Sequence, residues 1–188
     1  MSHDIRAWAA EHACKIDENG LLHVYKAVHK VNTKNGPRYI SDYAVAPSLL
    51  HAGYGVGLYR KACKQDIIEY TIGRNVEIDL LSLNTDPFED CGSGLHFGSH
   101  LYAAEFGDRW LDLAIIECGI AINDKNTKIV IPNGYDFSPP KIRTNKVTVL
   151  REDYSRAYYC CPGSEVFFGF YKQEEAWKDI LSILDGKE

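Results

Sequence analysis

Apolar residues recur at helical spacing in three short stretches of the chain. The first stretch follows Asp4, a residue type that caps helix N-termini, and the second follows Ser99. The third is an amphipathic stripe near the C-terminus that carries Trp177, Ile180 and Leu184. The pattern therefore predicts short helices over residues 4–14, 99–106 and 173–184.

Most of the other apolar segments have the length and the β-branched or aromatic content of strands. The segment 110–122 is nearly continuously apolar, which indicates a central strand buried on both faces. Turn-forming residues at 17–20 and 34–37 separate neighbouring segments. Strands are predicted over residues 21–28, 38–45, 66–78 (broken by a turn at 73–75), 110–122, 127–131 and 141–150, with a late hairpin made of 158–161 and 165–171.

Many strands and few long helices favour the α+β class over a doubly wound sheet. We expect a single domain over residues 1–188, with a bent antiparallel or mixed sheet and short flanking helices. The core spans about residues 21–152, and the helix at 4–14 and the hairpin plus helix at 157–186 decorate it. With 188 residues, 45 % of them hydrophobic, such a domain buries enough apolar surface to fold without disulfides or metals.

The chain carries a net charge of −5, from 26 acidic and 21 basic residues. Proteins that bind a phosphate backbone usually show a basic excess, so the charge disfavours nucleic acid as a partner and suits a basic protein surface. No apolar run approaches the ~20 residues that cross a bilayer, and the N-terminus lacks the layout of a signal peptide. We therefore expect a cytoplasmic protein without a membrane partner.

Six cysteines lie at positions 14, 63, 91, 118, 160 and 161. In a cytoplasmic protein of this length, most of them are expected to be reduced and buried. A zinc site made of Cys91, His96, His100 and Cys118 is an alternative, although the spacing is not that of a known zinc motif. A nucleophilic Cys91 with His96 or His100 as its base is a further alternative.

The densest group of reactive residue types is the stretch 91–100, Cys-Gly-Ser-Gly-Leu-His-Phe-Gly-Ser-His. Its glycines permit a sharp turn that presents amides to a ligand. His96 is a candidate acid, base or hydrogen-bond donor, and the helix that begins at Ser99 offers N-terminal amides to an anion such as phosphate. These features suit a nucleotide site. The equally weighted alternative is structural, with a tight turn, a satisfied core histidine and a packed cysteine.

Three further features admit both a binding and a structural interpretation. Arg143 suits bidentate recognition of a phosphate or carboxylate, but such an arginine is more often part of a strand-surface ion pair. The 12 tyrosines suit either a binding surface or half-buried strand positions. The glycine-rich segment 51–57 lacks the spacing of a dinucleotide-binding fingerprint and is expected to be a surface loop.

Four segments in order, residues 24–28 (Val-Tyr-Lys-Ala-Val), 70–77, 91–97 and 141–143, resemble a family of uncharacterised bacteriophage proteins. In that family a Tyr-Lys-Ala-Val strand, a Tyr-x-x-Gly-x-x-Val hairpin and a Cys-x-x-Gly-Leu-His turn recur in this order. The resemblance covers about residues 22–152. It implies a phage or prophage origin, and the host cytoplasm as the location.

Residues 94–106 are also similar to the segment of poly-ADP-ribose polymerases in which a glycine, an aromatic residue and a short helix line the nicotinamide pocket. This resemblance implies an ADP-ribosyltransferase-like fold. It places His96 at the position of the pocket tyrosine. The ligand-positioning residue of the first strand falls at Tyr25 or Lys26.

Together the resemblances imply a phage-type protein with NAD or ADP-ribose as its nucleotide ligand and a host protein as its target. Glu165, or alternatively Glu152, would supply the catalytic glutamate that acts with His96 and Tyr25. The competing hypothesis is a non-catalytic module that binds a host or defence protein through an acidic, tyrosine-rich surface over residues 30–60. The expected cofactor-binding residues are Gly94, Ser99 and Arg143.

Overall fold

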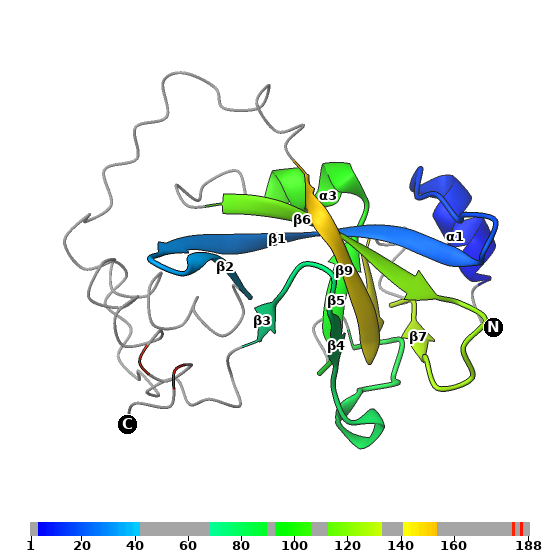
Figure 1. The fold of residues 1–188 in the computed structure, drawn as a ribbon. Coiled ribbons are helices and arrows are strands. Elements are labelled where there is room, and N and C mark those ends of the chain that lie inside the picture. Colours follow the sequence, from blue (N-terminus) through cyan, green and yellow to red (C-terminus); the bar gives the residue numbers. More distant parts are fainter. Residues whose placement is uncertain are drawn as a thin grey trace, which may run out of the picture.

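The computed structural model describes residues 4–41, 68–89, 93–106, 113–132 and 141–153, together with Ser182 and Asp185. These residues form an antiparallel sheet of nine strands with two short α-helices (Figure 1). The predicted α+β class is therefore confirmed. No helix within these ranges is long and apolar enough to cross a membrane. The loop 51–57, the late hairpin and most of the predicted C-terminal helix lie outside the described residues.

Both described helices begin at the caps that the sequence predicts. Helix α1 spans Ile5–Glu11, and the carboxylate of Asp4 accepts a hydrogen bond from the Arg6 N–H at 2.9 Å. Helix α3 spans His100–Phe106 and follows Ser99. The strands are β1 Leu21–Thr33, β2 Gly36–Ser41, β3 Glu69–Tyr70, β4 Asn75–Glu77, β5 Leu95–Gly98, β6 Leu113–Ala121, β7 Ile129–Val130, β8 Lys141–Thr144 and β9 Lys146–Asp153, and a 3-10 turn, η3, spans Leu80–Ser82.

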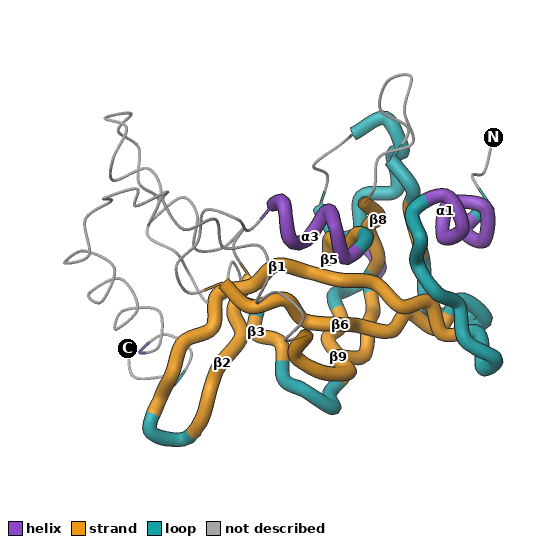
Figure 2. Tube along the Cα trace, turned by 90° about the horizontal axis from the view of Figure 1, so that it is seen from above, coloured by secondary structure: helices purple, strands orange, loops and turns teal. Residues whose placement is uncertain are grey.

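Strand β1 is the central strand of the sheet, and its 13 residues pair with other strands along both edges. One edge pairs with β6 from Leu21 to His29, and the other edge pairs with β5 at Tyr25 and with β2 from Val28 onward. The strand order is β4-β9-β6-β1-β5-β8-β7, with β2 and β3 on a separate path from β1. The β1–β2 hairpin and helix α1 therefore lie at opposite ends of β1 (Figures 1 and 2).

The two faces of the central strands are covered differently. One face, the core face, packs into the main core with Trp8 of α1 and Phe97 of β5. The other, the α3 face, carries helix α3 (Figure 2). A smaller cluster on this face includes Ile115 and Tyr25. Every residue from 114 to 120 is buried, which confirms the prediction of a central strand buried on both faces. Each fully buried aliphatic side chain stabilises the fold by about 1.5–3 kcal/mol.

Residues 95–98 form strand β5, which the sequence does not predict, and a bend at Ser93 and Gly94 precedes it. Leu95 and Phe97 are almost fully buried on the core face, so alternation leaves His96 on the α3 face. Among the described residues of this stretch, Gly94 has a left-handed backbone, with φ +153°. A run as short as Leu-His-Phe-Gly carries little local signal, and pairing with β1 and β8 decides its conformation.

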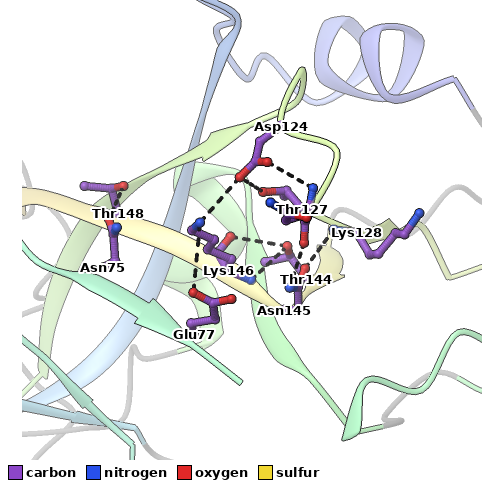
Figure 3. Close-up of polar contacts among 10 residues, drawn as sticks. Asn75, Glu77, Asp124, Thr127, Lys128, Thr144, Asn145, Lys146 and Thr148 are labelled. Carbon is purple, nitrogen blue, oxygen red and sulfur yellow. Dashed lines mark hydrogen bonds and ion pairs between the residues drawn. The ribbon is translucent and has the colours of Figure 1, made fainter. Parts of the chain in front are cut away.

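The predicted strand over residues 141–150 is divided into β8 and β9 at Asn145, which is fully buried. Its side-chain oxygen accepts from the Lys128 N–H at 2.7 Å (Figure 3). Its side-chain nitrogen donates to the Asn126 carbonyl at 3.0 Å. Lys146 forms an ion pair with Asp124 at 3.4 Å. The strand is interrupted because Asn145 and Lys146 attach the turn at 122–128 to it.

Candidate functional site

Strand β5 brings together most of the residues that the sequence marks as a site. Gly94 immediately precedes this strand, His96 lies within it and Ser99 immediately follows it. The two neighbouring strands contribute Tyr25 of β1 and Arg143 of β8. The structure thus confirms that these residues are neighbours, although it assigns several of them structural contacts.

Arg143 is closed to an external ligand because its side chain is fully buried. Its two terminal nitrogens donate to the main-chain carbonyls of Glu89 and Asp86, the latter at 2.5 Å. Its Nε has no hydrogen-bond partner within the described part of the chain. The predictions of a phosphate-binding arginine and of a surface ion pair are therefore both wrong. The segment 79–89 folds over β8, and the guanidinium satisfies carbonyls that this segment would otherwise bury unpaired.

Gly94 and Ser99 also have structural explanations. A Cβ at Gly94 would lie 2.8 Å from Cδ1 of Leu83, so only glycine permits this close packing. The Ser99 side chain is nearly buried, and its Oγ accepts from the Tyr102 N–H at 3.2 Å, which is the predicted helix cap. Anion binding at this helix start stays a prediction.

His96 lies on the α3 face, whereas the side chain of Lys26 lies on the core face. The Lys26 Nζ donates to the main-chain oxygen of His96 at 3.2 Å and lies 5.7 Å from the ring centroid of Phe97. Of the two first-strand residues that the resemblance offers, Tyr25 is therefore the one that shares a face with His96.

Tyr25 lies at the centre of a polar group on the α3 face. Its ring meets the ring of His100 edge-on, with centroids 5.1 Å apart. The Nε2 of His100 lies 2.8 Å from a carboxylate oxygen of Asp153. Burial and the nearby carboxylates of Glu117 and Asp153 raise the pKa of Tyr25 above its ordinary value. Its hydroxyl is therefore protonated at neutral pH and can donate a hydrogen bond.

Glu117 is the register partner of Tyr25 across β1 and β6, and it is only 5 % exposed. The Nδ1 of His23 lies 2.6 Å from one of its carboxylate oxygens, and the Nε of Arg151 donates to the other. Burial alone would raise the pKa of Glu117, but the hydrogen bonds from His23 and Arg151 outweigh it and hold the pKa below its ordinary value. An ionised carboxylate only accepts hydrogen bonds, so Nδ1 of His23 carries a proton.

These contacts define the Tyr25–Glu117 cluster on the α3 face. It contains two histidine–carboxylate pairs, His23–Glu117 and His100–Asp153. The neutral Tyr25 packs against His100 and lies opposite Glu117. The side chain of Arg151 is 70 % exposed, so part of its guanidinium is open to a ligand. Such a set can donate and accept protons, hold a hydroxyl group and bind an anion. The cluster consists of His23, Tyr25, His100, Glu117, Arg151 and Asp153.

The glutamates proposed from the resemblance are not part of this cluster. Glu152 is nearly buried on the core face, where Lys30 lies 2.8 Å from both of its carboxylate oxygens and the Tyr39 hydroxyl donates to it at 2.6 Å. Because it lies on the face opposite Tyr25 and His96, Glu152 is not placed to act with them as the alternative catalytic glutamate. Glu165 lies outside the described residues. The sequence did carry a signal for Glu117, a lone acid within an apolar strand, which an interpretation based only on burial overlooked.

The four residues of the zinc hypothesis are not brought together. Cys118 is fully buried in the main core, and His100 lies on the opposite, α3 face. Cys91 lies outside the described residues, and the described side chains include no group of three or more ligand types placed to hold a metal. Burial raises the pKa of the Cys118 thiol, as expected for a packed and unreactive cysteine.

Comparison with known proteins adds no relative to this picture. A scan against protein-family models finds no match, and neither the curated proteins nor the solved structures give a significant match.

Proposed function

We propose that the chain binds an NAD- or ADP-ribose-type nucleotide on the α3 face and uses Glu117 to act on its ribose. The observation that carries this proposal is an ionised, nearly buried carboxylate directly across from a neutral tyrosine. Titratable groups with perturbed pKa values gather at functional sites because chemistry needs them there. Arg151, one of the two partners of Glu117, is 70 % exposed and therefore lies within reach of a ligand.

The cluster offers a suitable group to each part of such a nucleotide. The rings of Tyr25 and His100 provide aromatic surface for a base. The exposed guanidinium of Arg151 suits the phosphates, and the Glu117 carboxylate suits a ribose hydroxyl. His96, on the same face, lies at the position that the resemblance to ADP-ribosyltransferases gives to the nicotinamide pocket.

In the catalytic form of the proposal, the bond between C1′ of the ribose and the nicotinamide nitrogen breaks, and its electron pair leaves with nicotinamide. The Glu117 carboxylate stabilises the positive charge that develops on the ribose. A nucleophile of a target protein then forms the new bond to C1′, and His100, held by Asp153, accepts its proton. The resemblance to phage proteins makes a host protein the proposed target.

Thermal unfolding with NAD, ADP-ribose, AMP and nicotinamide tests the binding step. A ligand at a hundred times its Kd adds ~2.7 kcal/mol of stability. For a chain of this length, that stabilisation corresponds to a rise of roughly 5–10 °C in Tm. We expect the rise with NAD or ADP-ribose, and its loss in Glu117→Gln and Tyr25→Phe. The matched control is Glu152→Gln, a nearly buried glutamate on the opposite face, which should keep the rise.

Two outcomes would count against the proposal. The first is the absence of any rise with the four compounds, and the second is a rise that survives in Glu117→Gln. The competing module hypothesis would then take its place, and it predicts that substitution of Tyr54 abolishes partner binding. In that segment, Tyr39 is buried against Glu152, while Tyr43, Tyr54 and Tyr59 lie outside the described residues.

A further inference from the structure

The segment 79–89, called here the 79–89 loop, presents large apolar side chains to solvent. Leu81 is 94 % exposed and Phe88 is 74 % exposed, and Leu80 is also exposed. Isolated surface leucines are common, but three large apolar residues within one short segment are typical of a contact surface.

Contacts with the rest of the fold hold the loop in a conformation in which Leu81 and Phe88 are exposed to solvent. Leu83 packs inward against Gly94 and is 5 % exposed. Arg143, beneath the loop, donates to two of its carbonyls, and the Asn84 N–H donates to the Ser93 carbonyl at 2.8 Å. The loop therefore has a buried anchor and a fixed backbone, and its exposed apolar side chains are pre-organised for a partner.

The surroundings of these side chains are acidic. Asp79, Asp86 and Glu89 lie on the loop, and the sequence contains no lysine or arginine between positions 75 and 108. Glu77, next to the loop, forms an ion pair with Lys146 at 3.9 Å. Asp79 and Asp86 accept hydrogen bonds from the main-chain N–H groups of Leu81 and Phe88, which fixes the carboxylates beside the apolar residues. The surface combines exposed apolar anchors with negative charge.

We infer that the 79–89 loop docks a basic segment of another protein, which carries apolar side chains among its lysines or arginines. Charge complementarity selects this occupant, because the acidic loop repels anionic lipid headgroups and nucleic acid. A symmetric contact with a second copy of this chain would place like charges opposite one another. This surface is distinct from the Tyr25–Glu117 cluster, so the inference does not depend on the proposed function.

Synthetic helical peptides provide the probe. The first peptide has leucine on one face and lysine on the other, the second replaces each lysine by glutamate, and the third replaces each leucine by serine. Fluorescence anisotropy with the full chain should show binding of the lysine–leucine peptide, and weakening of this binding as salt increases. Both altered peptides should bind at least tenfold more weakly.

The double variant Leu81→Ser/Phe88→Ser should bind the lysine–leucine peptide at least tenfold more weakly and keep the Tm of the parent chain, because both side chains are exposed. The matched control is Leu101→Ser, which alters an exposed leucine on α3 and should bind as the parent does. Undiminished binding by the double variant would overturn the inference. So would equal binding of the glutamate–leucine peptide, or no binding of the lysine–leucine peptide at low salt.

Discussion

Replacement of Lys30 by Met should destabilise the fold, because it removes a cation from a nearly buried carboxylate. The Lys30 Nζ lies 2.8 Å from both carboxylate oxygens of Glu152, which is 8 % exposed. Removal of one partner of a buried ion pair costs about 3–5 kcal/mol. The Lys30 side chain is itself 28 % exposed, which lowers the expected loss to about 3 kcal/mol.

The reciprocal variant, Glu152→Gln, should cost less. A glutamine oxygen still accepts the hydrogen bond of Tyr39, and a partly exposed Lys30 can reach water. We expect a loss of about 1–2 kcal/mol. The double variant Lys30→Met/Glu152→Gln removes both charges of this ion pair. Its loss should therefore be smaller than the sum of the two single losses by about 1–3 kcal/mol.

Urea unfolding at pH 7, followed by tryptophan fluorescence, measures these free energies because Trp8 lies in the main core. The denaturant slope should stay constant across the four proteins, so that midpoints report stability. Additive losses within about 0.5 kcal/mol would refute the assignment of Lys30 and Glu152 as a coupled pair. The measurement also establishes whether Glu152→Gln folds well enough to act as the control for Glu117→Gln.

Three further predictions follow from single residues. The pKa of Glu117 is lowered in the folded chain, so the ionised carboxylate stabilises the fold above the ordinary pKa of 4.5, and this stabilisation is lost as pH falls through the folded pKa. Urea midpoints measured from pH 3 to pH 7 should therefore depend less on pH in Glu117→Gln than in the parent. Burial raises the pKa of Cys14 to about 11 and also raises that of Cys118. Iodoacetamide at pH 8 should therefore leave both thiols unlabelled in the folded chain and label both in urea, as measured by peptide mass spectrometry. Gly94→Ala should destabilise the fold by at least about 1 kcal/mol through its left-handed backbone and its contact with Leu83, and an unchanged urea midpoint would contradict this.

The sequence predicts elements best where a single local signal dominates. Strand β6 is identified because its residues are apolar on both faces, and α1 and α3 because a cap precedes each apolar repeat. Strand β5 is missed because the alternation in Leu-His-Phe-Gly extends over only four residues and carries little strand signal of its own. Its conformation comes from β1 and β8, which are far away in sequence. Pairing between distant segments also divides residues 141–153 at Asn145.

The site is predictable as a neighbourhood but not as a set of roles. Tyr25, His96 and Ser99 are neighbours as expected, since β1 pairs with β5 directly before α3. The assignment of roles requires the face of each side chain, which depends on register. A shift of one residue in β9 would exchange Glu152, on the core face, with Asp153, on the α3 face.

The two most buried charged groups near β5 differ in how they are compensated, and this difference identifies the better candidate for function. The two terminal nitrogens of Arg143 donate to main-chain carbonyls, which neither titrate nor leave, so its charge serves the fold. Glu117 is satisfied by the side chains of His23 and Arg151, and that of Arg151 is 70 % exposed and can move into solvent. When a ligand displaces Arg151, the Glu117 carboxylate loses part of its compensation and gains affinity for positive charge at the same position. A developing cation on a bound ribose would supply such a charge, and this is why the proposed function assigns the ribose chemistry to Glu117.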